Sequence, residues 1–397
     1  MRRLSFSAAA LVAAGLLFSG CADEPAPQPQ STGLAEGPAG CPVPTGPISI
    51  AYGARANNPV PELPDGVLAA IDKAAYAGSE ITAFAVSGTP RDVDFQLTFH
   101  PQAKNPGAQR AEQDQLNQDL REQLGAIHAG NDEANPLATV DLAGRRAGPG
   151  GTVVLVDSGL QTVPPLDFHD ANLIGADPQE VAAALKQHGQ LPTLKGRTVV
   201  LVGVGYTADP QPALDTRQRN NLLDIWRAIA GTAEAACVGV YDQAGGDKPA
   251  SDLPHVSKIE FPVEKPPVPC GTTVLANSGR VGFKKNVAVF IDQQAAEQAI
   301  GEIADAMRKG NQHAKLIGTT ATDQSVEFRA KLSLQRANAV KDVLIRLGIP
   351  AERIETVGAG TTYKTHVNDI GPGGTLLPGP AAQNRSVVVE LSCPNGG

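Results

Sequence analysis

Aromatic residues and clusters of positive charge are both scarce in this sequence. Only 4% of the 397 residues are aromatic, which leaves little material for the stacking surfaces that sugar- and base-binding grooves often use. The formal net charge is -8, and lysine and arginine are scattered rather than clustered. Without a basic stripe or a polybasic patch, we expect no nucleic-acid partner and expect recognition to use polar and charged groups.

Sequence motifs that hold a cofactor, a metal or a catalytic nucleophile are also lacking. The chain has no P-loop, no GxSxG elbow and no CxxC pair, and its seven histidines are spread along its length. The segment from Gly203 to Gly205 follows an apolar run, but Asp209-Pro210 comes before a helix can start, which argues against a dinucleotide-binding loop. We therefore expect no cofactor, no metal site and no catalytic residue.

One group of polar residues keeps an enzymatic alternative open. It follows the apolar run that starts at Thr152 and consists of Asp157, Asp167, His169 and Asp170. The DxSxS pattern of the metal-binding loop in von Willebrand A-type domains is not completed after Asp157. We interpret the group as a polar loop without a site, whereas an enzyme would need a deep pocket near Asp157 and His169.

The first twenty residues have the features of an export signal. Arg2 and Arg3 supply positive charge, and the apolar run from Leu4 to Phe18 is too short to span a membrane comfortably. Small residues lead directly into Cys21, as in a bacterial lipobox, whose cysteine is diacylated and becomes the new N-terminus. We predict a signal peptide over residues 1–20 and lipidation of Cys21. The alternative is an ordinary secretory signal that leaves Cys21 as a free thiol.

Two segments with little apolar pattern predict the domain boundaries. Residues 21–47 are rich in proline, glutamine, glycine and serine, which is typical of a flexible stalk. Residues 244–270 contain two proline- and glycine-rich breaks around a short apolar stretch that can form one strand, and we interpret them as a linker. The predicted folded domains therefore cover residues 48–243 and 271–397.

Four cysteines remain after Cys21, and an even number in an exported chain suggests two disulfides. Three pairings are possible. Position favours two local ones, because Cys41 and Cys237 bracket the first domain while Cys270 and Cys393 bracket the second.

In residues 48–243, β-rich runs alternate with helical ones. The runs Thr152–Val156 and Thr198–Val202 both read Thr-Val-Val-Leu-Val, and such continuous apolar runs favour strands that are buried on both faces. Asp177, followed by proline, predicts a helix N-terminus. We predict an α/β domain with a doubly wound, Rossmann-like, mostly parallel sheet and leave its function unassigned.

The segment from residue 271 onward predicts a smaller sandwich with two helices on one sheet. The expected strands are at about 286–291, 314–318, 353–359 and 386–391, with helices at 293–308 and about 329–347. The second helix carries an apolar stripe that includes Leu332, Val340 and Leu344, and Arg336 lies on the same stripe. A guanidinium on an apolar face needs a carboxylate or carbonyl partner, so Arg336 is either a structural ion-pair residue or a ligand residue.

The sequence LSLQRANAVKDVLIRLGIPAERIETVGAG, followed later by QNRSVVVEL, resembles the C-terminal domain of the OmpA-like family. The resemblance covers about Asn286 to Leu391. It implies a βαβαββ fold and non-covalent binding of peptidoglycan through the free end of meso-diaminopimelate in the stem peptide. That end is a zwitterion, whose carboxylate suits a bidentate arginine and whose ammonium suits an aspartate.

The resemblance also implies a set of ligand-binding residues. Arg336 takes the position of the family's arginine, and the two residues before the last strand take that of its asparagine-arginine pair. The family's Gly-His-Thr-Asp run falls on Gly318 to Ala321, so its aspartate is missing, and Asp323 is the candidate replacement. The candidate ligand-binding residues are Thr320, Asp323, Arg336, Asn384 and Arg385.

These features favour an exported, non-enzymatic lipoprotein that faces the cell wall or periplasm and links a membrane to peptidoglycan. Cys21 is the expected membrane anchor, and the OmpA-like domain is expected to bind the stem peptide. Two alternatives remain open. One is an envelope scaffold with protein partners whose OmpA-like domain has lost wall binding, and the other is an envelope enzyme that acts through the first domain.

Overall fold

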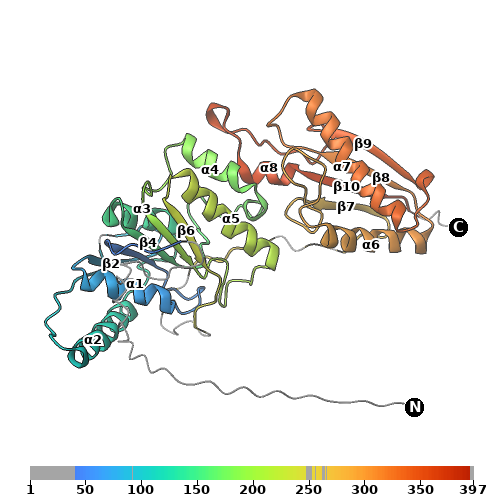
Figure 1. Cartoon of the computed structure of the whole chain (residues 1–397). Coiled ribbons are helices and arrows are strands. Elements are labelled where there is room, and N and C mark those ends of the chain that lie inside the picture. Colours follow the sequence, from blue (N-terminus) through green and yellow to red (C-terminus); the bar gives the residue numbers. More distant parts are fainter. Residues whose placement is uncertain are drawn as a thin grey trace, which may run out of the picture. The chain divides into compact units, whose positions relative to one another are not determined.

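Two β-sheets, each with its own helices, make up the part of the chain that the computed structural model describes (Figure 1). The described residues are 41–91, 93–246, 253–254, 256–261, 264 and 266–393. Both sheets belong to one compact unit of the chain. The predicted signal peptide, Cys21 and residues 21–40 of the predicted stalk lie outside the described residues.

The first sheet has six strands in the order β3-β2-β1-β4-β5-β6. All neighbours pair in parallel except β2 and β3, which are antiparallel, so the predicted doubly wound, mostly parallel sheet is confirmed. The strands are β1 (Ile48–Tyr52), β2 (Glu80–Ala85), β3 (Phe95–Thr98), β4 (Thr152–Val156), β5 (Thr198–Val202) and β6 (Cys237–Tyr241).

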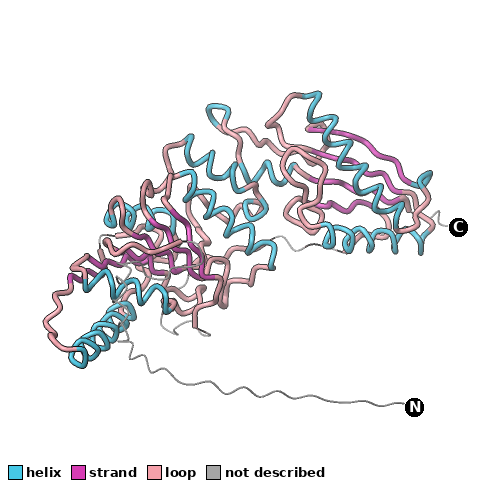
Figure 2. Tube along the Cα trace, viewed as in Figure 1, coloured by secondary structure: helices cyan, strands magenta, loops and turns pink. Residues whose placement is uncertain are grey.

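Helices cover both faces of this sheet and form two separate hydrophobic cores with it (Figure 2). In β4, Val153 and Leu155 face the core of α3, α4 and α5, whereas Val154 and Val156 face the core of α1 and α2. Burial on both faces is the reason for the continuous apolar runs of the central strands. The helices are α1 (Asp65–Tyr76), α2 (Pro106–Gly125), α3 (Pro136–Ala147), α4 (Pro178–Gln187) and α5 (Thr216–Thr232).

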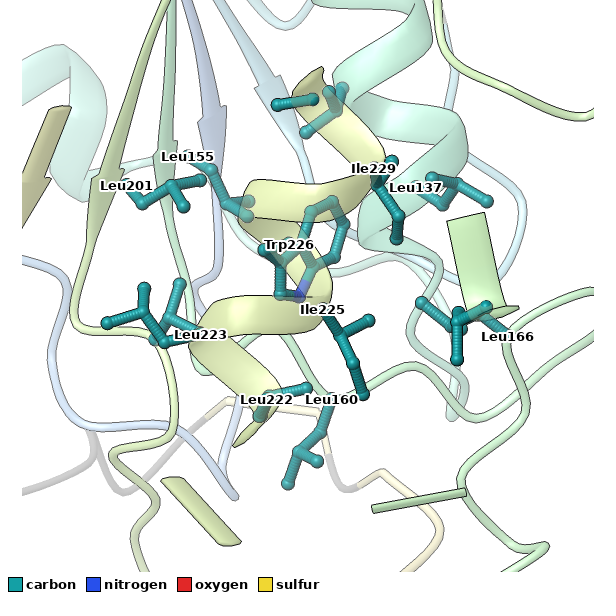
Figure 3. Close-up of a cluster of buried hydrophobic side chains, with 14 of the residues drawn as sticks. Leu137, Leu155, Leu160, Leu166, Leu201, Leu222, Leu223, Ile225, Trp226 and Ile229 are labelled. Carbon is teal, nitrogen blue, oxygen red and sulfur yellow. The ribbon is translucent and has the colours of Figure 1, made fainter. Parts of the chain in front are cut away.

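The single tryptophan lies at the centre of the larger core (Figure 3). Trp226 of α5 packs in the cluster that contains Leu155 and Leu201 of the sheet and Leu137 of α3. Its indole N–H donates to the carbonyl oxygen of Gly159 at 3.0 Å, which satisfies the one polar group of the ring. A Cβ on Gly159 would lie 2.5 Å from the indole nitrogen, so this close approach requires glycine.

The second sheet has four strands in the order β7-β10-β8-β9. The strands are β7 (Gly271–Ala276), β8 (Ala314–Thr319), β9 (Ile354–Gly360) and β10 (Ser386–Leu391), and the helices are α6 (Gln293–Gly310), α7 (Val326–Arg346) and α8 (Pro378–Asn384). The predicted βαβαββ order is confirmed, with the short helix α8 added before the last strand. Among all helices of the described ranges, none has the length and apolar character needed to cross a membrane.

Helix α7 lies directly against the backbone of the second sheet because two strand positions have no side chain. A Cβ on Gly318 of β8 would lie 1.8 Å from the carbonyl oxygen of Ser333, and a Cβ on Gly358 of β9 would lie 2.6 Å from that of Ala330. Any larger residue at these two positions would displace the helix. The glycines therefore fix the height of α7, and of Arg336 on it, above the sheet.

Several sequence-based assignments were wrong or missing. The strand expected at 286–291 does not form. Phe283 and Phe290 instead pair through an isolated bridge and bury their rings, while Val287 and Val289 are exposed. The first strand of the second sheet is β7 instead. Its threonine-rich start interrupts the alternation of apolar and polar residues that would predict a strand.

Two further differences lie before the second sheet. Helix α3 was not predicted. The apolar stretch of the predicted linker forms no strand within residues 256–261, because Val256 and Ile259 are buried in the core beside α5 instead.

Two disulfides join Cys41 to Cys237 and Cys270 to Cys393, with Cα separations of 5.8 and 4.6 Å. These are the two pairings that position favoured. The second disulfide extends the antiparallel pair of β7 and β10, because Gly271 lies opposite Leu391. Disulfides of this kind persist in oxidising compartments.

Replacing Cys270 and Cys393 together by alanine is expected to lower the free energy of unfolding by about 2–4 kcal/mol, since the disulfide closes a long loop. The two cysteines are 123 residues apart in sequence. Urea denaturation of the oxidised wild-type and variant chains, followed by far-UV circular dichroism, measures the difference. An unchanged unfolding midpoint would show that the disulfide does not stabilise the second sheet.

Candidate ligand-binding site

Arg336 lies on the buried face of α7, beneath the loop that leads from β7 to α6. Its side chain is 1% exposed. Nε and Nη2 reach the carbonyl oxygens of Val287 and Lys284 only at 3.5 and 3.4 Å, and Nη1 has no hydrogen-bond partner in the described part of the chain. The guanidinium also stands 5.3 Å from the ring centroid of Phe283. Arg336 is therefore a buried cation with long, weak hydrogen bonds.

The segment above Arg336 is a short turn, residues 284–289, that we call the covering loop. The N–H of Lys284 donates to the carbonyl oxygen of Val289 at 2.8 Å, which closes the loop. Its outward side chains include Val287, which is 44% exposed, and Val289, which is 52% exposed. The covering loop thus shields Arg336 from solvent while its own apolar side chains stay outside.

Arg385, between α8 and β10, binds a carboxylate from the first domain. Its Nη1 and Nη2 each donate to one oxygen of Glu180 at 2.7 Å, and both side chains are almost fully buried. This is the bidentate geometry that arginine adopts with a carboxylate ligand. Burial disfavours the charge of Arg385, but the hydrogen bonds and charge of Glu180 outweigh it, so the pKa of Arg385 is raised.

Glu180 also binds the covering loop. Its Oε1 lies 3.1 Å from Nζ of Lys285. Glu180 is held in the first turn of α4 by Asp177, whose side chain accepts the N–H groups of Gln179 and Glu180, as the predicted N-cap requires. A single carboxylate therefore joins Arg385, the covering loop and the start of α4.

Asp323 completes a cluster of charges with the two arginines. Its carboxylate lies 3.5 Å from Nη2 of Arg385 and is partly exposed. Burial, with the positive charge of Arg385, lowers the pKa of Arg336 to about 10, against the opposing effect of Asp323. A buried guanidinium whose charge is disfavoured by burial and by a neighbouring cation is stabilised by an anionic partner.

The neighbouring candidate residues are buried. Ala321, at the position of the family's aspartate, is 0% exposed. Thr320 is also buried, and its hydroxyl has no partner among the residues described. The amide of Asn384 binds the backbone of Val367 through both its oxygen and its nitrogen. Asn384 therefore holds a loop in place instead of pointing its amide toward a ligand.

The structure thus brings together Asp323, Arg336 and Arg385 of the predicted set. It also adds residues that the sequence analysis missed. Glu180 gave no signal because it lies 205 residues before Arg385. Asp369, which is buried, accepts the N–H of Thr322 beside Ala321, and its second oxygen has no partner within the described ranges.

Comparison with protein families gives a match for this part of the chain. Residues 283–371 match the model of the OmpA family. They form an OmpA-like domain. The comparison with curated proteins finds no match. The family match includes the covering loop, Asp323 and Arg336 and ends before Arg385.

Comparison with solved structures gives matches that cover about a third of the chain. The OmpA-like domain of FopA1 from Francisella tularensis is 22% identical, with a TM-score of 0.23, and the match covers 31% of this chain and 75% of that chain. The cell wall anchor of the T6SS from Pseudomonas aeruginosa is 21% identical, with a TM-score of 0.26 and coverage of 31% and 80%. The peptidoglycan-associated lipoprotein from Burkholderia pseudomallei is 19% identical, with a TM-score of 0.24 and coverage of 30% and 89%.

Outside the OmpA-like domain, the conspicuous polar group lies at the carboxyl ends of β1 and β4, where the strand order of the first sheet reverses. Doubly wound sheets commonly bind ligands at this point of the sheet. Here Arg55, which is 0% exposed, binds both oxygens of Asp157 and the hydroxyl of Ser158. The side chain of Asp157 is therefore fully engaged with the protein itself.

The other residues of the polar group that the sequence suggested, Asp167, His169 and Asp170, are partly or fully exposed. His169 Nδ1 is 2.7 Å from Oδ1 of Asp167, and both side chains are more than a third exposed. Asp170 accepts the N–H of Asn172. Within the residues that the structure describes, no three His, Cys, Asp or Glu side chains are grouped in a way that can hold a metal ion.

Proposed function

We propose that this chain is a lipid-anchored envelope protein that links a membrane to the cell wall by non-covalent binding of peptidoglycan. The observation that carries the proposal is the OmpA-like domain with its cluster of Asp323, Arg336 and Arg385. The two disulfides and the signal-like N-terminal sequence support export. Cys21 is the proposed lipid attachment site.

The proposed ligand is the free end of diaminopimelate in the stem peptide. Its carboxylate would bind the guanidiniums of Arg336 and Arg385, and its ammonium would bind Asp323. The low exposure of the cluster supports specific binding. Charged groups that are removed from water bind a ligand of matching charge more strongly, and they lower the affinity of a ligand that leaves them unpaired.

We also propose that the chain acts without catalysis. An enzyme that used the first domain would need Asp157 free to meet a substrate. The salt bridge to Arg55 and the hydrogen bond from the N–H of Gly159 occupy its carboxylate instead.

Wall binding is tested by co-sedimentation of the full chain, in mild detergent, with purified peptidoglycan. Diaminopimelate-type peptidoglycan is compared with the lysine-type polymer, which lacks the carboxylate at the same side-chain end. We expect the chain to pellet with the first and to bind the second at least about tenfold more weakly, because the second polymer lacks the carboxylate that the arginines would bind. Equal binding to both polymers would contradict diaminopimelate recognition.

The membrane anchor is tested separately by growth with labelled palmitate. The wild-type chain is expected to incorporate the label, and the Cys21→Ser chain is expected to lose it. Label in both chains, or in neither, would contradict lipidation of Cys21.

A scaffold role is the second candidate function. Two observations favour it: alanine stands at the family's aspartate position, and Arg385 is bound to Glu180 of the same chain. Failure of both the folded wild-type chain and its Glu180→Gln variant to bind either polymer would support the scaffold.

A further inference from the structure

Glu180 occupies Arg385 as a carboxylate ligand would. Both guanidinium Nη atoms donate to its two oxygens at 2.7 Å, in a place where both side chains are less than a tenth exposed. A stem-peptide carboxylate and the Glu180 carboxylate therefore require the same two donors. They cannot bind Arg385 in the same way at the same time.

The same carboxylate controls access to Arg336. Glu180 binds Lys285, and Lys285 belongs to the covering loop, whose carbonyl groups lie over Arg336. A ligand that takes Nε and Nη2 of Arg336 as its two donors must displace these carbonyl groups and with them the loop. The contact with Glu180 holds the loop in its closed position.

A wider surface supports this contact. Ala382 of α8 is buried in the core of the first domain, and the side chains of Asn172 and Gln383 form a hydrogen bond at 3.3 Å. Gly175 packs so closely on Ser278 that a Cβ would lie 2.7 Å from its Cα. The ion pair is thus one part of a packed surface rather than an isolated surface contact.

From these contacts we infer that the first domain is an internal inhibitor of the OmpA-like site, in which Glu180 takes the place of the wall carboxylate and locks the covering loop. This inference rests on the proposed function. Wall binding then requires Glu180 to leave Arg385 and Lys285. The apparent affinity is the intrinsic affinity reduced by the fraction of chains in which the site is open.

Two variants of the full chain test the inhibitor. Glu180→Gln removes the competing charge while it keeps the shape of the side chain. Gly175→Ala introduces a Cβ against the backbone of Ser278, which separates the packed surface without altering any charged residue of the site. Both are expected to bind diaminopimelate-type peptidoglycan at least about tenfold more tightly than wild type, since each raises the open fraction.

Two matched control variants leave the contact of Glu180 with Arg385 and Lys285 unchanged. Glu234→Gln removes an exposed carboxylate that pairs with Lys195, and Gly231→Ala adds a Cβ in helix α5 where no atom lies within 4 Å. Both controls are expected to bind as wild type. Unfolding followed by Trp226 fluorescence shows whether each variant is folded.

The outcomes distinguish failure of the inhibitor from failure of wall binding itself. Tighter binding by both folded variants, including binding that wild type lacks, supports the inhibitor. If wild type binds and either folded variant binds no more tightly, the inhibitor is wrong and wall binding stands. If no chain binds, wall binding itself fails and the inhibitor fails with it.

Discussion

The Asp157→Ala chain is expected to lose about 3–5 kcal/mol of the free energy of unfolding of the first domain. The reason is Arg55, which is 0% exposed and would keep a buried positive charge without its partner. The N–H of Gly159 would also lose its acceptor, Oδ1 of Asp157 at 2.7 Å. Urea denaturation followed by fluorescence of Trp226, the single tryptophan, reports on this domain alone.

Two further chains show whether the loss comes from the unpaired charge. Removing both partners, in Arg55→Leu/Asp157→Leu, is expected to restore much of the loss, because no charge is then left buried. Asp167→Ala removes a carboxylate that is partly exposed and is expected to change the free energy by less than about 0.5 kcal/mol. A single Asp157→Ala chain as stable as Asp167→Ala would contradict the importance of the buried pair.

The first sheet was predictable because its central strands are buried on both faces. The Thr-Val-Val-Leu-Val runs of β4 and β5 carry that signal, and Asp177 with the following proline marks the start of α4. The strand β7 was not predictable in the same way. It is an edge strand with exposed and half-buried positions, so its pattern does not stand out from the linker before it.

The strand that was wrongly assigned to residues 286–291 shows a limit of apolar patterns. The two phenylalanines are buried, with their ring centroids 4.8 Å apart, but the residues between them turn back instead of extending. A short apolar run has the same composition in either conformation. Tertiary packing of the two rings decides between them.

The site was only half predictable. The apolar stripe of α7 showed that Arg336 must be buried, and the family resemblance added Arg385. The partner of Arg385 is Glu180, in a helix of the other domain, and no local pattern connects residues that are 205 positions apart. The resemblance therefore gave the cations of the cluster, whereas the structure was needed to find the anion that neutralises one of them.

Replacing Arg336 by methionine is expected to weaken binding to diaminopimelate-type peptidoglycan by about 100-fold. Loss of a buried, charge-assisted contact costs at least about 2–3 kcal/mol of binding free energy. The free energy of unfolding is expected to stay the same or rise by about 1–3 kcal/mol, because methionine fills the space without burying a charge. Co-sedimentation and urea denaturation of the same preparations measure the two effects.

The opposite signs of these effects distinguish a ligand residue from a structural one. Arg336 lacks a partner for Nη1 in the described part of the chain and has only long hydrogen bonds to Val287 and Lys284, so its burial costs free energy in this closed state. Arg346→Met, on the exposed face of the same helix, removes an ion pair with Glu297 and is the matched control, with no expected change in binding. If Arg336→Met lowered stability and left wall binding intact, Arg336 would be a structural residue and the ligand site would lie elsewhere.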